Sequence, residues 1–285
     1  MLEFNKITKK FNSDLFTQSF VALEDVSFKV EPGKIVGFLG ANGAGKTTSL
    51  KIAMDFIRPT SGTVTFDKNL GTRNIDIFNN IGFLPERPFF YPHLKGREFC
   101  HFMGKLSDLT KNEINEKISF WAPRFKIDFA LDREINTYSK GMLQRVGFLV
   151  TLIHSPKFII LDEPLSGLDP IGRKELKDII VEVNKLGKTV FFSSHIVSDV
   201  EEVCDNVIFL KDGKLYYEGS VDKIIEDNIR PIANICFRKN GIFEIIKISN
   251  ELKNQKIKEL LNNNCEIVSV NSDKPTLEEI IYNVK

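Results

Sequence analysis

Residues 40–48 read Gly-Ala-Asn-Gly-Ala-Gly-Lys-Thr-Thr and fill the phosphate-binding pattern G-x-x-x-x-G-K-[ST]. Glycines permit the tight backbone path that turns several N–H groups toward one anion. Lys46 can then reach the β- and γ-phosphates of a nucleotide, and the Thr47 hydroxyl can coordinate Mg²⁺. The sequence therefore predicts an ATP-type site whose candidate contacts are Gly40, Asn42, Gly43, Ala44, Gly45, Lys46, Thr47 and Thr48.

The segments beside this phosphate loop (residues 40–48) fit a strand–loop–helix unit. Residues 35–39, Ile-Val-Gly-Phe-Leu, form an apolar run suited to a buried strand. A helix that starts at the loop would aim its positive dipole end at the phosphates. Apolar residues at i, i+3, i+4 and i+7 predict that this helix continues until just before Pro59: Leu50, Ala53, Met54 and Ile57.

Composition indicates an ordinary globular chain. Of its 285 residues, 42% are hydrophobic and 27% charged, and the net charge of +1 gives no reason to expect nucleic acid as a partner. The four cysteines have no metal-binding or redox spacing. The first residues lack a signal-peptide pattern, and no run approaches the roughly 18 apolar residues that a membrane span needs. We therefore expect no direct membrane span, and any membrane role should come through a partner.

The remaining patterns predict an α/β chain in two parts. Continuous apolar runs at 158–161 and 189–192 are typical of buried parallel strands, and residues 172–186 supply a crossover helix between them. The tetrapeptide 211–214, Lys-Asp-Gly-Lys, predicts a two-residue hairpin turn. After residues 229–231 the pattern restarts as a small α/β unit. The other expected elements are strands at 22–30, 63–66, 232–237, 242–248 and 266–270, helices within about 87–154 and at 251–262, and a last helix capped by Thr276 and Glu279.

Two carboxylates end the predicted strand 158–161. In an open α/β sheet, ligands bind at the carboxyl ends of strands, so Asp162 and Glu163 should lie beside the phosphates. Asp162 suits the Mg²⁺ shell, and Glu163 can act as general base toward the attacking water. An apolar strand that ends in Asp-Glu is more often only a solvated terminus. The nearby phosphate loop favours the catalytic interpretation.

A second anion-binding pattern lies at residues 138–142, Tyr-Ser-Lys-Gly-Met, which open an apolar-striped helix. Ser139 can be a plain N-cap. Alternatively, Ser139 and the Gly141 backbone can donate hydrogen bonds to a γ-phosphate at the helix start. Local sequence alone leaves both interpretations open.

Taken in order, these motifs resemble the ATP-binding cassette (ABC) ATPase family over about residues 1–225. They are the phosphate loop, the signature at 138–142, the Asp162-Glu163 strand, the tetrapeptide 166–169 and His195. The resemblance implies an ATPase with ATP and Mg²⁺ as cofactors. It also implies a dimer, either a homodimer or a pair with a sister ATPase, in which one subunit's signature closes on the other's phosphate loop.

The same resemblance assigns further residues. Asp169 would reach across the dimer interface, and His195 would contact the γ-phosphate and orient the catalytic group. Phe11 resembles the aromatic that stacks on adenine, although a core phenylalanine is a competing interpretation because the chain has 24. Glu86 stands where the family usually has glutamine; it can still accept from a metal-bound water. Lys140 and Met142 replace the commoner Gly and Gln of the signature.

These variants and the C-terminal appendage resemble the bacterial exporter branch of the family, in which a separate membrane permease pairs with the ATPase. Residues 87–94, Arg-Pro-Phe-Phe-Tyr-Pro-His-Leu, would then dock the permease. Packing within the chain's own helical subdomain is the alternative.

The expected protein is thus the ATP-hydrolysing subunit of a transporter, at the cytoplasmic face of the membrane. The expected fold is α/β, a P-loop (RecA-like) parallel-sheet core with an N-terminal antiparallel β subdomain, an inserted helical subdomain and a C-terminal α/β appendage. The expected domains are 1–228 and 229–285. A rival class is a non-transport ABC ATPase of DNA repair or translation; the single phosphate loop, the lack of sustained heptads in 49–137 and the missing basic patch disfavour it.

Overall fold

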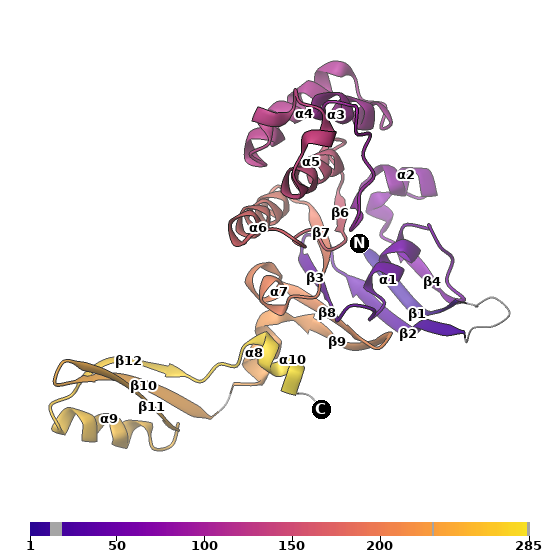
Figure 1. The fold of residues 1–285 in the computed structure, drawn as a ribbon. Helices are drawn as coiled ribbons and strands as arrows, with labels where there is room; N and C mark the ends of the chain where they lie inside the picture. The colour runs from indigo at the N-terminus through magenta and orange to yellow at the C-terminus, as the bar shows by residue number, and fades with distance from the viewer. Residues whose placement is uncertain (12–18, 230, 284–285) are drawn as a thin grey trace. The chain divides into compact units, whose positions relative to one another are not determined.

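The computed structural model describes residues 1–11, 19–229 and 231–283 (Figure 1). Residues 12–18, part of the N-terminal region expected to be rich in strands, lie outside the described residues. The chain forms two compact units, Met1–Gly219 and Ser220–Lys285. Helix α8 (Val221–Asp227) therefore belongs to the second unit, whereas the sequence-based boundary lies just after it, at 228/229.

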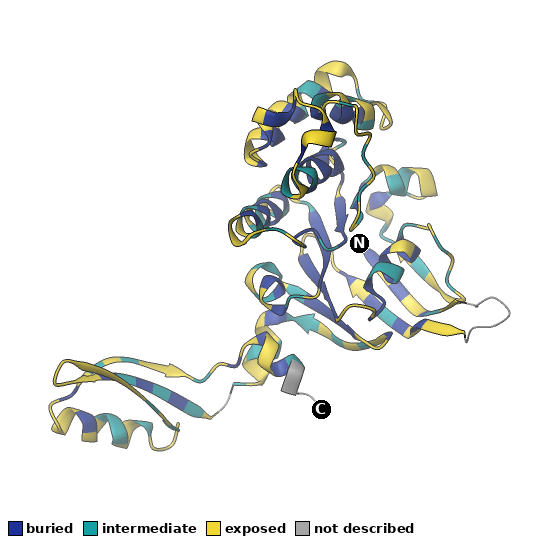
Figure 2. Cartoon of the chain, viewed as in Figure 1, coloured by how far each residue is buried: buried dark blue, intermediate teal, exposed yellow. Residues whose placement is uncertain are grey.

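A six-stranded sheet forms the centre of the first unit, in the order β5-β6-β7-β3-β8-β9. Strands β5 to β8 are parallel and largely buried, as continuous apolar runs between covering helices require (Figure 2). Asp212 and Gly213 join β8 to β9 with φ of 49° and 76°, the two positive values that a tight hairpin turn needs, so the predicted hairpin is confirmed. The strands are β3 (Ile35–Leu39), β5 (Ile81–Leu84), β6 (Phe158–Leu161), β7 (Thr189–Ser194), β8 (Asn206–Lys211) and β9 (Lys214–Ser220).

The helix after the phosphate loop is shorter than predicted. α1 (Lys46–Ala53) ends with Met54 as its C-cap, and Asp55 takes a left-handed φ of 56° that stops the helical hydrogen-bond ladder. The prediction that the helix continues through Ile57 is therefore wrong. Met54 and Ile57 still pack against the core from this irregular segment.

An antiparallel sheet in the order β2-β1-β4 packs on the central sheet through aromatic side chains. Phe28 stacks on Phe4 with ring centroids 4.4 Å apart, and lies 5.4 Å from Phe38 of β3 and 6.1 Å from Phe191 of β7. This cluster joins the two sheets beside the phosphate loop. The strands are β1 (Leu2–Phe11), β2 (Phe20–Val30) and β4 (Ser61–Phe66).

The helical part of the first unit starts later than predicted. Residues 85–95 are not helical, because Pro85, Pro88 and Pro92 each lack the N–H that a helix needs. The helices begin at Gly96, and a capping box of Thr110 and Glu113 starts the longest of them. They are α3 (Gly96–Lys105), α4 (Lys111–Arg124), α5 (Lys140–Leu152) and the short η2 (Asp128–Ala130) and η3 (Ile135–Thr137); the rest of the unit adds η1 (Lys68–Leu70), α2 (Asn74–Asn79), α6 (Pro170–Lys185) and α7 (Val197–Val203).

The second unit is a small α/β structure, as predicted. Its antiparallel sheet has the order β11-β10-β12, and Ile235, Phe237, Leu260 and Cys265 form its core. Thr276 Oγ1 accepts from Glu279 N at 3.1 Å at the start of the last helix. Across both units, no described helix is long and apolar enough to cross a membrane. The elements of the second unit besides α8 are β10 (Ile232–Lys239), β11 (Ile242–Ser249), α9 (Lys253–Asn262), β12 (Glu266–Ser272) and α10 (Leu277–Asn283).

Candidate functional site

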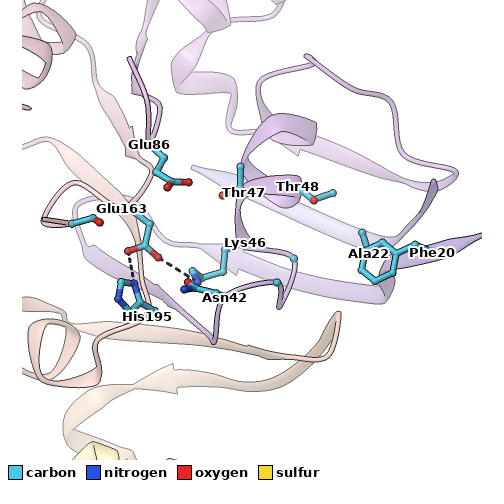
Figure 3. Close-up of a pocket in the computed structure, with 12 residues that line it drawn as sticks. Phe20, Ala22, Asn42, Lys46, Thr47, Thr48, Glu86, Glu163 and His195 are labelled. Carbon is cyan, nitrogen blue, oxygen red and sulfur yellow. Dashed lines mark hydrogen bonds and ion pairs between the residues drawn. The ribbon is translucent and has the colours of Figure 1, made fainter. Parts of the chain in front are cut away.

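The phosphate loop borders a pocket of about 380 Å³ in the first unit (Figure 3). The loop follows β3, Glu86 follows β5, Glu163 follows β6 and His195 follows β7. Since these are neighbouring parallel strands, their carboxyl ends bring the four segments to one edge of the sheet. The lining residues are Phe20, Ala22, Asn42, Gly43, Gly45, Lys46, Thr47, Thr48, Glu86, Glu163, Ser166 and His195.

The loop's path depends on glycine at two positions. Gly43 and Gly45 have φ of 84° and 104°, values that L side chains rarely adopt. A Cβ on Gly45 would also lie 2.6 Å from Leu23 Cδ2 and 2.7 Å from the Ala22 carbonyl oxygen. Close approach of β2 to the loop therefore requires glycine at position 45, which is also the N-cap of α1.

Lys46 is the buried cation of the pocket. Its side chain is 6% exposed, and its Nζ donates to the carbonyl oxygens of Gly40 at 2.7 Å and Ala41 at 3.2 Å. Nζ also lies 3.3 Å from Glu163 Oε1. Lys46 is thus held by its own loop and by the carboxylate opposite.

Glu163 is positioned by strand ends on both sides. Its backbone has a left-handed φ of 49°, an unusual conformation for a non-glycine residue that is often found at functional sites. Its N–H donates to Ser193 Oγ at 2.8 Å, and Oε2 lies 2.8 Å from His195 Nδ1. The remaining oxygen, Oε1, is buried and accepts no hydrogen bond from the described residues. A donor entering the pocket would satisfy it.

Asp162 lies beneath the pocket, 2% exposed. Burial raises its pKa, hydrogen bonds from Ser193 and Thr47 oppose that shift, and the negative charges of Glu86 and Glu163 add to it. Ser193 Oγ donates to Asp162 Oδ1 at 2.6 Å. A divalent cation beside these carboxylates would relieve their repulsion.

The chemistry of this donor set fits Mg²⁺. No described group of three His, Cys, Asp or Glu residues could hold a metal by itself. Mg²⁺ usually takes one or two carboxylates and completes its shell with water and substrate phosphates. Thr47, Asp162 and Glu86 can supply the protein part of such a shell.

Several predicted site residues do not line the pocket. Gly40 and Ala44 belong to the loop without lining the pocket, and Phe11 lies on β1, 41% exposed, with Lys9 Nζ 5.0 Å from its ring centroid. Phe20, paired with Phe11 across the two strands, lines the pocket instead. Figure 3 shows Phe20 and Ala22 at the opposite end from Glu163 and His195. Sequence reasoning missed Phe20, Ala22 and Ser166 as lining residues, and only the pairing of the two strands brings Phe20 there.

The signature residues and Asp169 also lie outside this pocket. Ser139 is exposed at the N-cap of α5 and accepts from Met142 N at 3.3 Å. Gly141 is partly exposed, and a Cβ there would meet nothing closer than 3.5 Å. Asp169 is exposed at the N-cap of α6, where Oδ1 accepts from Gly172 N at 3.1 Å. All three are available to a partner.

The predicted docking loop, residues 87–94, borders a second cavity of about 320 Å³. Phe89 is 76% exposed, whereas Phe90 packs on buried Phe99 with ring centroids 5.2 Å apart. Exposed Phe89 therefore fits the docking interpretation, whereas Phe90 fits packing within the chain's own helical subdomain. This docking groove is lined by Phe83, Leu84, Pro85, Pro88, Phe89, Phe90, Phe99, Met103, Leu106, Ser107, Gly147, Val150, Thr151 and His154.

Comparisons with known proteins agree with these motifs. A family model described as ABC transporter matches residues 23–166. An ABC transporter ATP-binding protein of Nostoc sp. is 38% identical over 234 residues, covering 81% of this chain and 68% of that protein. The ABC transporter ATP-binding protein YhaQ of Bacillus subtilis is 28% identical over 98% of this chain and 97% of its own length. The fold is similar, with a TM-score of 0.69 and 22% identity, to a dimeric ATP-binding cassette solved with ADP and Pi, covering 77% of this chain and 98% of that one.

Proposed function

The chain belongs to the ABC transporter family as an ATP-binding, ATPase-type domain, and we propose that it couples ATP hydrolysis to export through a separate membrane permease. The observation that carries the catalytic part is the Lys46–Glu163–His195 cluster beside the phosphate loop. The cluster supports the proposal because one pocket holds a lysine that can bind phosphate, a carboxylate that can accept a proton from water and an imidazole that can orient this carboxylate.

Binding of ATP begins with the phosphate loop. Its N–H groups and the start of α1 supply a positive cradle for the triphosphate. Lys46 then exchanges its contacts with Gly40, Ala41 and Glu163 for the β- and γ-phosphates. This exchange frees Glu163 Oε1 for another partner.

Thr47, Asp162 and Glu86 would hold Mg²⁺ together with the nucleotide's phosphates. The ion would neutralise charge that develops on the transferred phosphoryl group. Ionised Asp162 is required for this role, and Ser193 keeps one of its oxygens fixed through the 2.6 Å hydrogen bond.

Glu163 is the general base in this proposal. Its Oε1 accepts the proton of the attacking water, and the ring of His195 holds Oε2 and thereby fixes the carboxylate plane. The fixed backbone of Glu163, bonded to Ser193, prevents the carboxylate from swinging away. Phe20 and Ala22 lie at the other end of the pocket, and Phe11 pairs with Phe20. These residues would contact the adenine ring of ATP.

The dimer arises from the residues that remain outside the pocket. Ser139, Gly141 and Asp169 are accessible and would complete the site of a second subunit. That subunit is a second copy or a sister ATPase. The dimeric state of a cassette with the same fold supports this arrangement.

The permease would dock in the groove beside residues 87–94, with Phe89 as an exposed anchor. Glu86 joins this loop to the phosphate-loop pocket, so it can couple nucleotide state to docking. The subunit would then act at the cytoplasmic face of the membrane. The rival function, a non-transport ABC ATPase in DNA repair or translation, lacks a comparable supporting feature.

Phosphate release tests the catalytic proposal. Wild-type protein with Mg²⁺ and ATP should release phosphate, and Glu163→Gln should be slower by about 10²–10⁴-fold because an amide cannot take the proton. ATP binding should persist in the variant. Exposed Glu251 on the second unit provides the matched control, Glu251→Gln. Hydrolysis by Glu163→Gln at the control's rate would show that another group is the base.

A further inference from the structure

A cavity of about 370 Å³ lies between α4, the segment after α5 and the end of α6, in the first unit. It shares no lining residue with the phosphate-loop pocket or with the docking groove. Its volume is within the range of small-molecule sites. The lining residues are Glu116, Lys117, Phe120, Trp121, Leu152, Ser155, Pro156, Val183, Leu186 and Lys188.

The floor of this α4–α6 cavity is apolar. Trp121, Leu152 and Val183 are buried, whereas Phe120 and Leu186 are 39% and 51% exposed at its margin. The Arg124 guanidinium lies 3.7 Å from the centroid of the Phe120 ring and fixes that ring's outer face. An apolar chain or ring could be buried here and gain favourable burial energy.

The rim of the cavity is basic. Lys117 and Lys188 line it, and burial, followed by the positive charges of Lys117 and Lys157, lowers the pKa of Lys188. Lys188 Nζ donates to the Ser155 carbonyl oxygen at 3.1 Å, and Lys157 Nζ to that of Asn69 at 2.9 Å.

No ion pair joins Lys117, Lys157 or Lys188 to a described carboxylate. The other ion pairs nearby are already formed between Arg124 and Glu182 and between Lys126 and Glu175. Among the described residues that line the cavity, Glu116 is the one with an acidic side chain. The charge of Glu113 acts on Lys117 without forming an ion pair, and an anion at the rim would further offset the repulsion that Lys117 and Lys157 exert on Lys188.

We propose that the α4–α6 cavity binds an amphipathic anion: a carboxylate or phosphate headgroup at Lys117 and Lys188, with an apolar body against Trp121. The headgroup charge complements the rim, and the apolar body matches the floor. Such a ligand would join α4 to α6. The proposal does not depend on the ATPase assignment.

Trp121 makes the test direct because it is the chain's single tryptophan. The full-length protein is titrated with decanoate, decyl phosphate and uncharged decanol while tryptophan fluorescence is recorded. The dye 8-anilinonaphthalene-1-sulfonate gives a second readout. Energy transfer from Trp121 reports that the dye is bound, and loss of this transfer reports that a ligand has displaced the dye. We expect at least one of the two anions to bind tenfold or more tightly than decanol, and the tighter anion identifies the headgroup.

Charge-removing variants locate the headgroup. The double variant Lys117→Gln, Lys188→Gln should lose most of the preference for the anion over decanol. Because two charge-assisted contacts are removed, its affinity for the anion should fall about tenfold or more. Exposed Lys185, the last residue of α6 and outside the cavity lining, provides the control Lys185→Gln. The single variant Lys117→Gln, whose lysine makes no hydrogen bond to a described residue, serves if the double variant does not fold. Equal affinity for anion and decanol in the wild type, or equal losses in Lys117→Gln and the control, would overturn the proposal.

Discussion

At the scale of single residues, Lys46 and Glu163 hold each other where the phosphates should lie. The 3.3 Å separation of Nζ and Oε1 places the Lys46 cation against the carboxylate that we propose as the general base. In the proposed mechanism Lys46 leaves this contact for the phosphates, so Glu163 competes with ATP for the Lys46 ammonium group. Mutations of the two residues should therefore change ATP affinity in opposite directions. Removing the Glu163 carboxylate should raise the affinity, and removing the Lys46 ammonium group should lower it.

Lys46→Ala should weaken ATP binding at least tenfold, because a charge-assisted contact is worth about 1.5–3 kcal/mol. Isothermal titration calorimetry with ATP measures the loss. The exposed Lys51 of the same helix provides the control, and Lys51→Ala should bind ATP as the wild type does. Equal affinities for the two variants would mean that the loop does not bind phosphate through Lys46.

Asp162→Asn should raise the thermal stability of the nucleotide-free protein at pH 7 while abolishing Mg²⁺-dependent hydrolysis. Burial raises the pKa of Asp162, so its ionised form costs folding free energy at neutral pH. That cost fades as the pH falls through the raised pKa toward the ordinary aspartate value of 3.8, so the advantage of Asn should be smaller at pH 4 than at pH 7.

Differential scanning calorimetry at both pH values tests the sign. Ser193 Oγ can still donate to the amide oxygen of the variant, so the geometry is kept. A lower melting temperature for Asp162→Asn at pH 7 would contradict the proposed cost of the buried charge.

At the scale of elements, the start of α1 depends on how closely β2 passes the phosphate loop. Gly45→Ala should lower the melting temperature and ATP affinity strongly, because its Cβ would lie 2.7 Å from the Ala22 carbonyl oxygen. Gly43→Ala has a similar left-handed φ but open space around the Cβ, so it should cost only about 1–2 kcal/mol of backbone strain. Similar melting temperatures for the two variants would show that the close approach of β2 is unimportant.

The docking loop offers a second matched pair of aromatic residues. Phe89→Ala should reduce recovery of the subunit with its permease from detergent-solubilised membranes, as expected of an anchor worth about 2 kcal/mol. Phe129, 67% exposed in η2 and outside the groove, provides the control Phe129→Ala. Both changes should leave basal hydrolysis unchanged. Phe90→Ala is a poorer probe because Phe90 packs on Phe99 within the subunit. Equal recovery of the Phe89 and Phe129 variants would remove Phe89 from the docking site.

Sequence patterns located most elements because apolar periodicity and turn residues act locally. The runs at 158–161 and 189–192 coincide with buried parallel strands, and Asp212-Gly213 forms the predicted turn. Two helix boundaries differ from the predictions. Helix α1 ends early at Asp55 despite a continuing apolar stripe, and prolines keep residues 85–95 out of the helical part.

The site, too, was predicted from the sequence only in part. Motif spacing identified Lys46, Glu163 and His195, but their hydrogen bonds follow from strand order, which no single stretch of sequence contains. Phe20 lines the pocket because β2 pairs with β1, whereas the family resemblance suggests Phe11 for contact with adenine.

At the scale of the whole molecule, every lining residue of the phosphate-loop pocket lies in the unit Met1–Gly219. That unit also carries Ser139, Gly141 and Asp169, which are accessible and outside the pocket. One subunit therefore holds two halves of a site that two subunits would complete. The central claim is that ATP joins these halves across a dimer and that Glu163 then hydrolyses it.

The most direct test is the mass of Glu163→Gln measured by light scattering after size exclusion, with and without Mg²⁺ and ATP. The variant should bind ATP without consuming it, so the predicted result is one chain's mass without nucleotide and twice that mass with it. Lys46→Ala combined with Glu163→Gln should keep the mass of one chain under both conditions. A mass for Glu163→Gln that stays unchanged at saturating ATP, with ATP bound, would contradict the ATP-joined dimer.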